Sequence, residues 1–359
     1  MISLLAAFFT SFIATILIIR TQKLHGGFSG DRDLAGPQKF HTKVVPRVGG
    51  IAIGLGIFVA IALRHQSNLE NATDLILLFC ALPVFGIGIA EDVTKKISVR
   101  TRLIFTAFGV LLANLFLGAQ INGLDIPLID YAFAIPMVSI VFTIFAATGL
   151  ANAYNIIDGF NGLSSMVGII SLLGLGYVGF KLNDPMIFSL SFTMASAILG
   201  FFIWNYPRGL IFLGDGGAYL IGFWIAILSI LMVGRHSEIS PWFAVLVNAY
   251  PILETLFTIY RRKFHQGTSL GHPDGTHFHS LIFRRILNRK NTTTESDWFS
   301  ANAKTSPYLW VLSGFSVIPA IFLYDSTPML IGFLLTFVIS YAWLYRRVVT
   351  FRTPKWMHP

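Results

Sequence analysis

The chain has little charge and only one cysteine. Asp, Glu, Lys and Arg make up 12% of its 359 residues, whereas a soluble protein carries about 25%. A soluble globular protein of this length is therefore excluded. The single cysteine, Cys80, excludes an intramolecular disulfide, and we interpret it as a small apolar packing residue. Apolar residues form 54% of the chain and occur in blocks long enough to cross a bilayer, which takes about 20 residues per helix.

These apolar blocks predict an all-α, polytopic integral membrane protein with about 10–11 transmembrane helices. The first block starts at residue 1 without a basic segment or a small-residue cleavage site, so we interpret it as a span and not as a signal peptide. We expect residues 1–359 to form a single transmembrane domain. The expected spans are roughly 1–19, 49–64, 74–90, 103–118, 131–151, 163–180, 186–204, 217–233, 241–259, 307–323 and 328–345.

Lys and Arg are distributed unevenly over the connecting segments. With the N-terminus outside, 23 of the 26 Lys and Arg fall in cytoplasmic segments, and only Arg64, Lys181 and Arg235 fall outside. The positive-inside rule therefore predicts an external N-terminus and a cytoplasmic C-terminus. The net charge of +9 is mostly this topology signal and not a nucleic-acid footprint, so no nucleic-acid partner is expected. It also favours contact with anionic lipid head groups.

A polar segment, Asn-Ala-Tyr-Asn-Ile-Ile-Asp-Gly-Phe-Asn at 152–161, follows directly on an apolar run. Asn152, Asn155 and Asp158 are three residues apart, so a helix would step each back by about 60° and keep all three on one broad face. Gly159 offers a C-terminal stop for that helix. A polar stripe beside lipid is costly, so we expect it to face a polar site inside the bundle. The segment therefore indicates an intramembrane enzyme.

Two adjacent carboxylates, Glu91 and Asp92, open a second polar segment. They could hold Mg²⁺, or one could act as a base while the other positions it. The alternative is an ordinary positive-inside loop that the acidic pair neutralises. Four cations that could pair with phosphates follow within ten residues: Lys95, Lys96, Arg100 and Arg102.

One carboxylate, Asp215, stands among Gly214, Gly216 and Gly217 at the mouth of a span. Glycines let a ligand approach the backbone, and the N–H groups of a helix start favour anions. Asp215 there suits a hard cation that bridges to a phosphate. The alternative is a glycine-rich helix entry in which Asp215 is the N-cap.

The long segment 260–306 carries basic residues and a histidine cluster, and we expect it to be a substrate-recognition element. His277 and His279 are two apart, so they would not share a face of a regular helix, whereas an extended or turn conformation could aim both at one ligand. Zinc is a weak interpretation because cysteine ligands are absent. Phosphate binding by His together with Arg is the better one, and a basic loop drawn to lipid head groups remains the alternative.

Five motifs in this order resemble the polyprenyl-phosphate N-acetylhexosamine-1-phosphate transferases, in glycosyltransferase family 4. The Pro-Asp opening of the last motif is similar to the corresponding motif of the undecaprenyl-phosphate GlcNAc-1-phosphate transferase-like branch. The matching residues are Pro46, Gly49 and Gly50; Glu91 and Asp92 with Lys95 and Lys96; Asn152 to Leu163 in Asn-x-x-Asn-x-x-Asp-Gly-x-x-Gly-Leu; Gly214 and Asp215; and Pro273, Asp274, His277 and His279 in Pro-Asp-x-x-His-x-His.

The chain departs from the family pattern at three positions. Glu91 stands where the acidic pair usually has Asp, and its side chain is one methylene longer. Whether this position serves a role that needs tight geometry is therefore left open. Ser280 stands where a third histidine is common, and Ala218 where a serine is usual.

The resemblance implies a reaction and its partners. A phosphate oxygen of undecaprenyl phosphate would attack the sugar-linked phosphorus of a UDP-N-acetylhexosamine, releasing UMP and starting lipid-linked O-antigen or other envelope polysaccharide synthesis. The site would lie on the cytoplasmic face of a bacterial inner membrane. A homodimer is left open as a further partner.

The resemblance also assigns residues. Mg²⁺, with Mn²⁺ as an alternative, would be held by Asp215. Catalysis would fall to Asp92, Glu91 and Asp158. Substrate binding would fall to Asn152, Asn155, Lys95, Lys96, His277, His279, Asp274 and Arg284.

Three alternatives stay open. Within the family, the chain could be a phospho-N-acetylmuramoyl-pentapeptide transferase of peptidoglycan synthesis, although that branch has a denser histidine cluster. A secondary transporter would place its polar residues near the bilayer midplane, often in repeated halves, whereas here they gather at one face. Glu91 and Ser280 keep a non-catalytic lipid-binding protein open as well.

Overall fold

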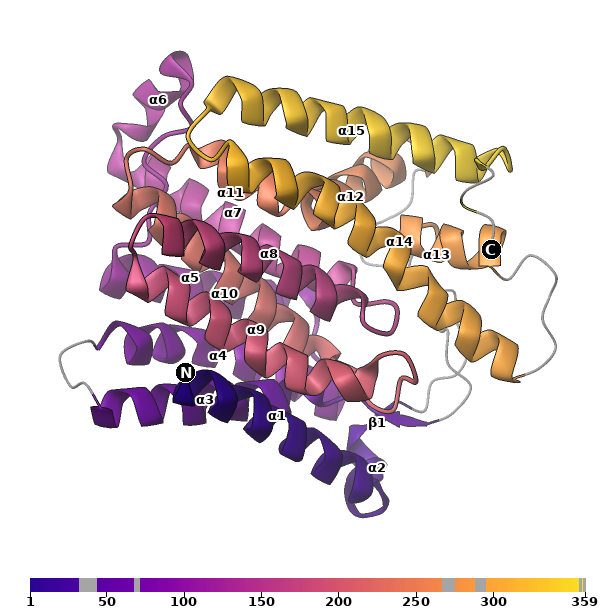
Figure 1. The fold of residues 1–359 in the computed structure, drawn as a ribbon. Coiled ribbons are helices and arrows are strands. Elements are labelled where there is room, and N and C mark those ends of the chain that lie inside the picture. The colour runs from indigo at the N-terminus through magenta and orange to yellow at the C-terminus, as the bar shows by residue number, and fades with distance from the viewer. Residues whose placement is uncertain (32–43, 68–71, 267–274, 288–294, 355–356, 358–359) are drawn as a thin grey trace.

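The computed structural model describes residues 1–31, 44–67, 72–266, 275–287, 295–354 and 357, and these form a bundle of helices (Figure 1). Two short strands pair antiparallel, Gly30 with Pro46 and Asp31 with Val45. The elements are α1 (Ile2–Arg20), α2 (Gln22–Ser29), β1 (Gly30–Asp31), β2 (Val45–Pro46), α3 (Gly49–Ser67), α4 (Thr73–Thr94), α5 (Val99–Leu117), α6 (Pro127–Phe133), α7 (Pro136–Ile156), α8 (Leu163–Lys181), α9 (Pro185–Asn205), α10 (Gly214–Arg235), α11 (Pro241–Val247), α12 (Ala249–Arg261), the π-helical turn η1 (Arg262–Gln266), α13 (Phe278–Ile282), the π-helical turn η2 (Phe283–Leu287), α14 (Glu295–Phe322) and α15 (Thr327–Val349).

The helices confirm an all-α, polytopic membrane protein. Within the described residues, nine helices are long and apolar enough to cross a membrane, and α11 with α12 passes the same test as a pair. Together with the shorter apolar helix Gly49–His65 of α3, they account for the eleven expected spans.

The span expected at 241–259 is broken, which the sequence did not predict. Helices α11 and α12 are bent by 78° at Asn248. Pro251 has no backbone N–H, so a continuous helix would leave the carbonyl of Val247 without its donor. The Ser171 hydroxyl donates to that carbonyl instead, at 3.2 Å. A neighbouring helix thus satisfies the backbone group that the break exposes.

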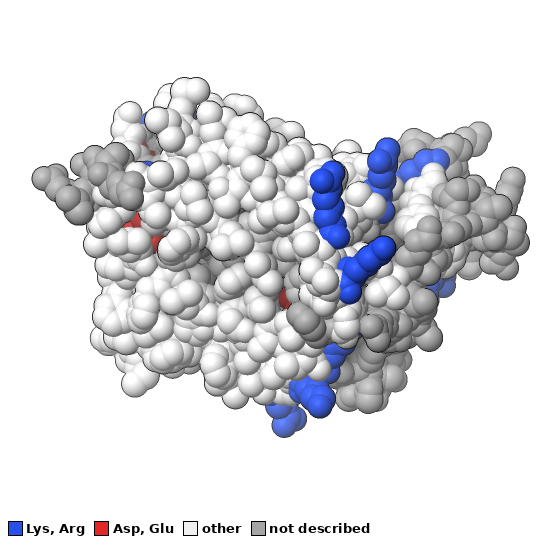
Figure 2. Space-filling view, turned by 90° about the horizontal axis from the view of Figure 1, so that it is seen from below, with Lys and Arg blue, Asp and Glu red and all other residues white. Residues whose placement is uncertain are grey.

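The loops divide between two ends of the bundle. At one end, Thr327 donates to Asp125 at 2.6 Å and the Trp242 indole donates to the Leu124 carbonyl at 2.7 Å. At the other end lie β1, α2 and α13, and Figure 2 shows the basic side chains of one face gathered there. This second end collects the segments that the charge pattern predicts to be cytoplasmic.

Helix α10 runs through the middle of the bundle and is buried along nearly its whole length. Small residues allow its neighbours to approach closely. A Cβ at Gly50 of α3 would lie 2.3 Å from the Gly217 nitrogen, and a Cβ at Gly88 of α4 would lie 2.6 Å from the Gly216 Cα. Lipid supplies no hydrophobic force between helices, so close packing of small residues replaces it. The glycines therefore hold the start of α10 against α3 and α4.

Candidate active site

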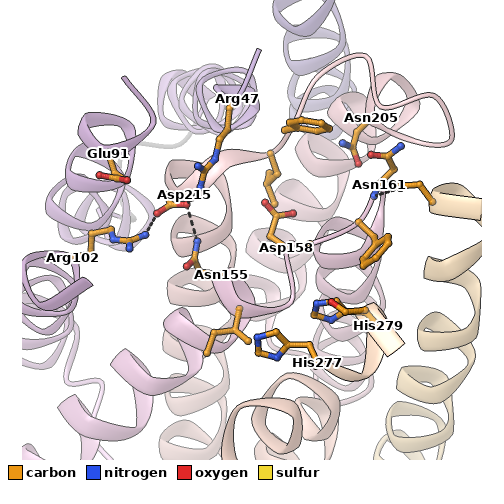
Figure 3. A pocket seen from close by; sticks show the side chains of 17 residues that line it. Arg47, Glu91, Arg102, Asn155, Asp158, Asn161, Asn205, Asp215, His277 and His279 are labelled. Carbon is orange, nitrogen blue, oxygen red and sulfur yellow. Dashed lines mark hydrogen bonds and ion pairs between the residues drawn. The ribbon is translucent and has the colours of Figure 1, made fainter. Parts of the chain in front are cut away.

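A polar cavity of about 350 Å³ opens at the basic end of the bundle (Figure 3). Its lining comes from segments far apart in the chain, and we name three walls by their residues. The acidic wall is Arg47, Glu91, Arg102, Asn155 and Asp215; the histidine wall is His277, His279 and Ser280; the asparagine wall is Asn161, Asn205 and Asn302. Asp158 lies between the acidic wall and the histidines (Figure 3).

Asp215, at the start of α10, is the centre of the acidic wall. It is buried, and Arg47 and Arg102 each pair with one of its carboxylate oxygens. The side-chain amide of Asn155 donates to the same oxygen as Arg47, at 3.1 Å (Figure 3). Two guanidinium groups thus balance a carboxylate that would otherwise be costly to bury.

Asp92 lies beneath Asp215 and is fully buried. Its two oxygens accept from the backbone N–H groups of Asp215 at 2.7 Å and Gly216 at 2.9 Å. These first N–H groups of α10 have no acceptor within their own helix, and a carboxylate is stabilised at a helix N-terminus. Gly214 has a φ of +76°, and a Cβ there would lie 2.6 Å from Asp92 Oδ2. Asp92 therefore caps α10, and it is not among the described residues that line the cavity.

The polar stripe at 152–158 does not lie on one helix face, because α7 ends at Ile156. The Tyr154 carbonyl, which a continuing helix would bond to the Asp158 N–H, accepts from the Ser164 hydroxyl at 3.0 Å instead. The Asp158 N–H bonds to the Asn155 carbonyl in a tighter turn. The expected common face is therefore wrong. Asn152 lies deeper, where its side-chain oxygen accepts from the Tyr219 hydroxyl at 2.8 Å.

Asp158, in the turn after α7, faces the cavity. Burial raises the pKa of its carboxyl to about 7, and the nearby Arg47 guanidinium opposes that rise. A carboxyl with such a pKa changes its protonation state near neutral pH. It is therefore able to exchange a proton or a hydrogen bond with a ligand in the cavity.

His277 and His279 present stacked rings, with centroids 5.1 Å apart and planes at 17°. His277 precedes α13 in an extended conformation, with ψ of 150°, and His279 lies within the helix. This change of conformation puts both rings on one side although the residues are two apart. The His277 Nδ1 lies 3.1 Å from Glu254, which is fully buried behind it.

The asparagine wall joins the loop after α7 to two distant helices. The Asn161 N–H donates to Asn302 Oδ1 of α14 at 3.1 Å, and the Gly162 N–H donates to Asn205 Oδ1 of α9 at 2.6 Å. The Asn161 side chain donates to the Pro207 carbonyl at 3.1 Å. These bonds fix the loop, so the cavity has one uncharged wall of amides beside its two ionisable walls.

The sequence profile described as glycosyl transferase family 4 matches residues 74–233, which include the acidic pair, the Asn152–Asp158 segment and Asp215. The chain is 26% identical over 286 residues to a probable undecaprenyl-phosphate N-acetylglucosaminyl 1-phosphate transferase of Bacillus subtilis, covering 79% of this chain and 78% of that protein. Residues 74–233 of the chain are thus similar to glycosyl transferase family 4.

Other relatives are similar in extent. An undecaprenyl-phosphate alpha-N-acetylglucosaminyl 1-phosphate transferase of Yersinia pestis is 27% identical, with 69% of this chain and 68% of that protein covered. A decaprenyl-phosphate N-acetylglucosaminephosphotransferase of Mycobacterium tuberculosis is also 27% identical, with 68% and 67% covered. The histidine wall lies outside the matched residues 74–233.

Some family-motif residues lie away from the cavity. Lys95 ends α4 in the left-handed conformation and donates from Nζ to the Gly30 carbonyl at 2.7 Å, which ties α4 to β1. Lys96 and Arg284 are exposed and are not among its described lining residues. Asp274 lies outside the described residues.

Sequence reasoning assigned no site role to several residues that line the cavity or lie behind it. Arg47 sits inside the Pro-x-x-Gly-Gly element, yet nothing in the sequence pairs it with a carboxylate 168 positions away. Asn302 belongs to no motif. Glu254 carried one usable signal, because an acid within a span is a functional candidate by default. Ser280 is fully buried, and its hydroxyl has no hydrogen-bond partner among the described residues, so it is available to a ligand.

The donor chemistry of the acidic wall fits Mg²⁺. Among the described residues, no group of three His, Cys, Asp or Glu comes close enough to form a metal cage. Mg²⁺ is usually held by one or two carboxylates together with substrate phosphates and water, so a full cage is not required. Asp215 supplies a buried carboxylate in a cavity that also has Glu91 and Asp158. Zinc would need a closed nitrogen or sulfur set that the wall does not supply.

Proposed function

We propose that this protein transfers an N-acetylhexosamine 1-phosphate from a UDP-sugar to a polyprenyl phosphate, undecaprenyl phosphate in the first instance, and releases UMP. The observation that carries the proposal is the cavity itself, which joins a carboxylate–arginine cluster to two stacked histidines at the basic end of a membrane bundle. The names of the relatives indicate the same reaction class.

The reaction depends mainly on electrostatic stabilisation of its phosphate groups. An oxygen of the lipid phosphate attacks the sugar-linked phosphorus, the bond from that phosphorus to the oxygen of UMP breaks, and UMP leaves as the diphosphate lipid forms. Two anions must meet in this step, so the catalyst has to neutralise and orient phosphate oxygens. A cavity with guanidinium and imidazole groups on opposite sides meets that demand.

The acidic wall supplies the charge balance. Mg²⁺, or Mn²⁺ in its place, would be held by Asp215 and would neutralise the diphosphate of the donor. Arg47 and Arg102 now pair with Asp215, and they are placed to transfer to phosphate oxygens once that carboxylate has another partner. The side-chain amide of Asn155 donates to Asp215 and fixes the position of its carboxylate.

Among the carboxyl groups, Asp158 is the best placed to meet the lipid phosphate. It lines the cavity and has a pKa of about 7. Glu91 also lines the cavity, while its carboxylate accepts from the Ile97 N–H at 2.6 Å. Asp92 would act indirectly, because it caps the helix that carries Asp215.

The histidine wall would bind diphosphate oxygens of the donor, with the 260–306 segment deciding which sugar is accepted. The site would lie on the cytoplasmic face of a bacterial inner membrane, with the N-terminus outside, where nucleotide sugars are available. Its product would enter O-antigen or other envelope polysaccharide synthesis.

The test is a reconstituted assay. The purified full-length protein is incubated with Mg²⁺, undecaprenyl phosphate and a panel of UDP-N-acetylhexosamines that includes the UDP-muramoyl-pentapeptide, and UMP release is measured. We expect UMP with at least one simple N-acetylhexosamine donor and none without the lipid phosphate. If no donor gives UMP release while the Bacillus subtilis relative is active in the same assay, the proposal is ruled out.

A further inference from the structure

A carboxylate is buried directly behind the histidine wall. Glu254, on α12, is fully inaccessible, and its Oε1 lies 3.1 Å from Nδ1 of His277 and 3.1 Å from the backbone nitrogen of Phe278. Its other oxygen, Oε2, accepts from the Tyr341 hydroxyl of α15 at 2.8 Å. Glu254 does not line the cavity, so it can act on a ligand only through the groups around it, of which His277 lines the cavity and is in direct contact with Glu254.

The hydrogen bonds of Glu254 determine where the imidazole proton lies. The Phe278 backbone N–H can only donate, and an ionised carboxylate can only accept. The Phe278 N–H and the Tyr341 hydroxyl both donate to this buried carboxylate, which suits its charged form. Nδ1 of His277, 3.1 Å from Oε1, therefore carries a proton and donates a hydrogen bond to Glu254, and the Thr258 hydroxyl oxygen lies 3.2 Å from the same nitrogen. The second ring nitrogen, Nε2, is then the atom left for the cavity that His277 lines.

The segment before His277 is held from the same side. Arg261 Nη1 donates to the Thr276 carbonyl and to the Tyr345 hydroxyl, each at 2.7 Å, and the Tyr345 hydroxyl lies 3.0 Å from that carbonyl. Tyr341 and Tyr345 both belong to α15. The last membrane helix therefore fixes the backbone that leads into the histidine wall as well as the carboxylate behind it.

Stability alone does not account for this arrangement. A buried ion pair can often be replaced by apolar residues of similar volume without loss of stability. What an apolar replacement could not do is accept a hydrogen bond from Nδ1 and so hold one ring orientation. Carboxylates that accept from metal-bound imidazoles have this effect, and losing them typically costs about 10–100-fold in metal affinity or activity.

We infer that Glu254 is a positioning residue, which accepts from Nδ1–H of the His277 imidazole and directs Nε2 into the cavity, where the Nε2–H of the charged imidazole donates to phosphate oxygens of the donor. The inference rests on the proposed function for the identity of the ligand. Tyr341 keeps Glu254 in place, so the C-terminal helix takes part in setting up the site although it does not line the cavity.

The principal variant is Glu254→Gln, which keeps the size of the side chain and one accepting oxygen but removes the charge. We expect it to lower kcat by about 10–100-fold with little change in the melting temperature. If Glu254 acts only through His277, the same substitution will cost nothing further in a His277→Gln background. Equal losses in both backgrounds would overturn the inference.

A matched pair of tyrosine variants separates positioning from general packing. Tyr341→Phe removes the hydroxyl that donates to Glu254 and should lower kcat by a smaller factor than Glu254→Gln. Tyr250→Phe removes a buried hydroxyl one turn from Glu254 that has no hydrogen-bond partner among the described residues, and it should leave kcat unchanged. Equal effects of the two substitutions would contradict the assignment, and this pair remains informative if Glu254→Gln fails to fold.

A spectroscopic readout tests the imidazole without turnover. In ¹⁵N-histidine-labelled full-length protein, the His277 signals, assigned by their loss in His277→Gln, should show a protonated Nδ1 in the wild type and a mixture of tautomers in Glu254→Gln. Addition of UDP should shift Nε2. An unprotonated Nδ1 in the wild type would overturn the inference. A protonated Nδ1 in a protein that releases no UMP would instead leave the positioning intact and refute the proposed function.

Discussion

The acidic and histidine walls of the cavity are built in opposite ways. In the acidic wall the carboxylate of Asp215 faces the cavity, and the cations that balance it line the same cavity. In the histidine wall the imidazoles line the cavity, and the carboxylate of Glu254 is buried behind them. We therefore expect the acidic wall to exchange its internal ion pairs for a metal ion and phosphates, and the histidine wall to keep its pair and offer only one face.

The two walls also differ in how they are held. Glycine contacts between α3, α4 and α10 fix the acidic wall, with backbones almost touching. Hydrogen bonds from tyrosine and arginine side chains on α12 and α15 fix the histidine wall. Close backbone contacts tolerate no added atoms, whereas a side-chain network can be weakened one bond at a time. The predictions below use that difference.

The largest effect is expected at Asp215. Asp215→Asn keeps the shape but leaves Arg102 without its counter-charge and Arg47 with only Asp92, 3.6 Å away, and it removes the proposed Mg²⁺ ligand. Turnover should fall on the order of 10³-fold, as for the loss of a group that stabilises transition-state charge. UMP release in the reconstituted assay measures it.

The matched control for that variant is Asp74→Asn. Asp74 is also a buried carboxylate paired with an arginine, Arg64. It lies in the first turn of α4, at the end of that helix away from Asp92 and the cavity. Turnover per folded molecule should be unchanged in this control. Retained activity in Asp215→Asn would remove Asp215 from the reaction.

The second prediction concerns pH and Asp158. Because its pKa is raised to about 7, the carboxylate is mostly protonated at pH 5 and mostly ionised at pH 9. If the ionised form meets the lipid phosphate, kcat should fall about tenfold for each pH unit below that pKa. Rates measured from pH 5 to 9 should show this acid limb in the wild type and lose it in Asp158→Asn, which would be slow throughout. A limb that persists unchanged in Asp158→Asn would assign it to another group.

The third prediction tests the packing of the acidic wall. Gly88→Ala adds a Cβ 2.6 Å from the Gly216 Cα, so the two helices must shift apart. We expect a loss of about 1–3 kcal/mol of stability, as for other overpacked sites, together with reduced turnover. Gly86→Ala, two residues away on the same helix, meets no heavy atom within 4 Å and serves as the control. Thermal unfolding in detergent should separate the two, and identical melting temperatures would show that the contact is looser than described.

The smallest effect is expected at Ser280 of the histidine wall. Its buried hydroxyl has no partner among the described residues, so Ser280→Ala should leave the melting temperature unchanged or slightly raised. If the hydroxyl bonds to the donor, its loss should cost about 1 kcal/mol, or roughly fivefold in KM for the UDP-sugar. An unchanged KM would place the donor elsewhere in the cavity.

The outcome at particular residues shows how far sequence reasoning reached. Asn155, Asp158, Asp215, His277 and His279 were expected to meet, and all five line one cavity. Lys95 and Lys96 were expected to bind substrate but are not among its described lining residues. Lys95 ends α4 in the left-handed conformation and points its ammonium group at β1 instead. Composition cannot show such a local turn.

By itself, the sequence determined the class of the protein, the number of its spans and the end at which its polar chemistry collects. Each of these follows from local properties of the chain: the length of apolar runs, the position of Lys and Arg, and the order of short motifs. Only the tertiary structure decided which charges balance one another. The pairing of Arg47 and Arg102 with Asp215, the capping of α10 by Asp92, and the place of Glu254 behind His277 all depend on close approach between helices that are distant in sequence. The local sequence pattern does not show which helices pack together, because the lipid-facing and protein-facing surfaces of a membrane helix are both apolar.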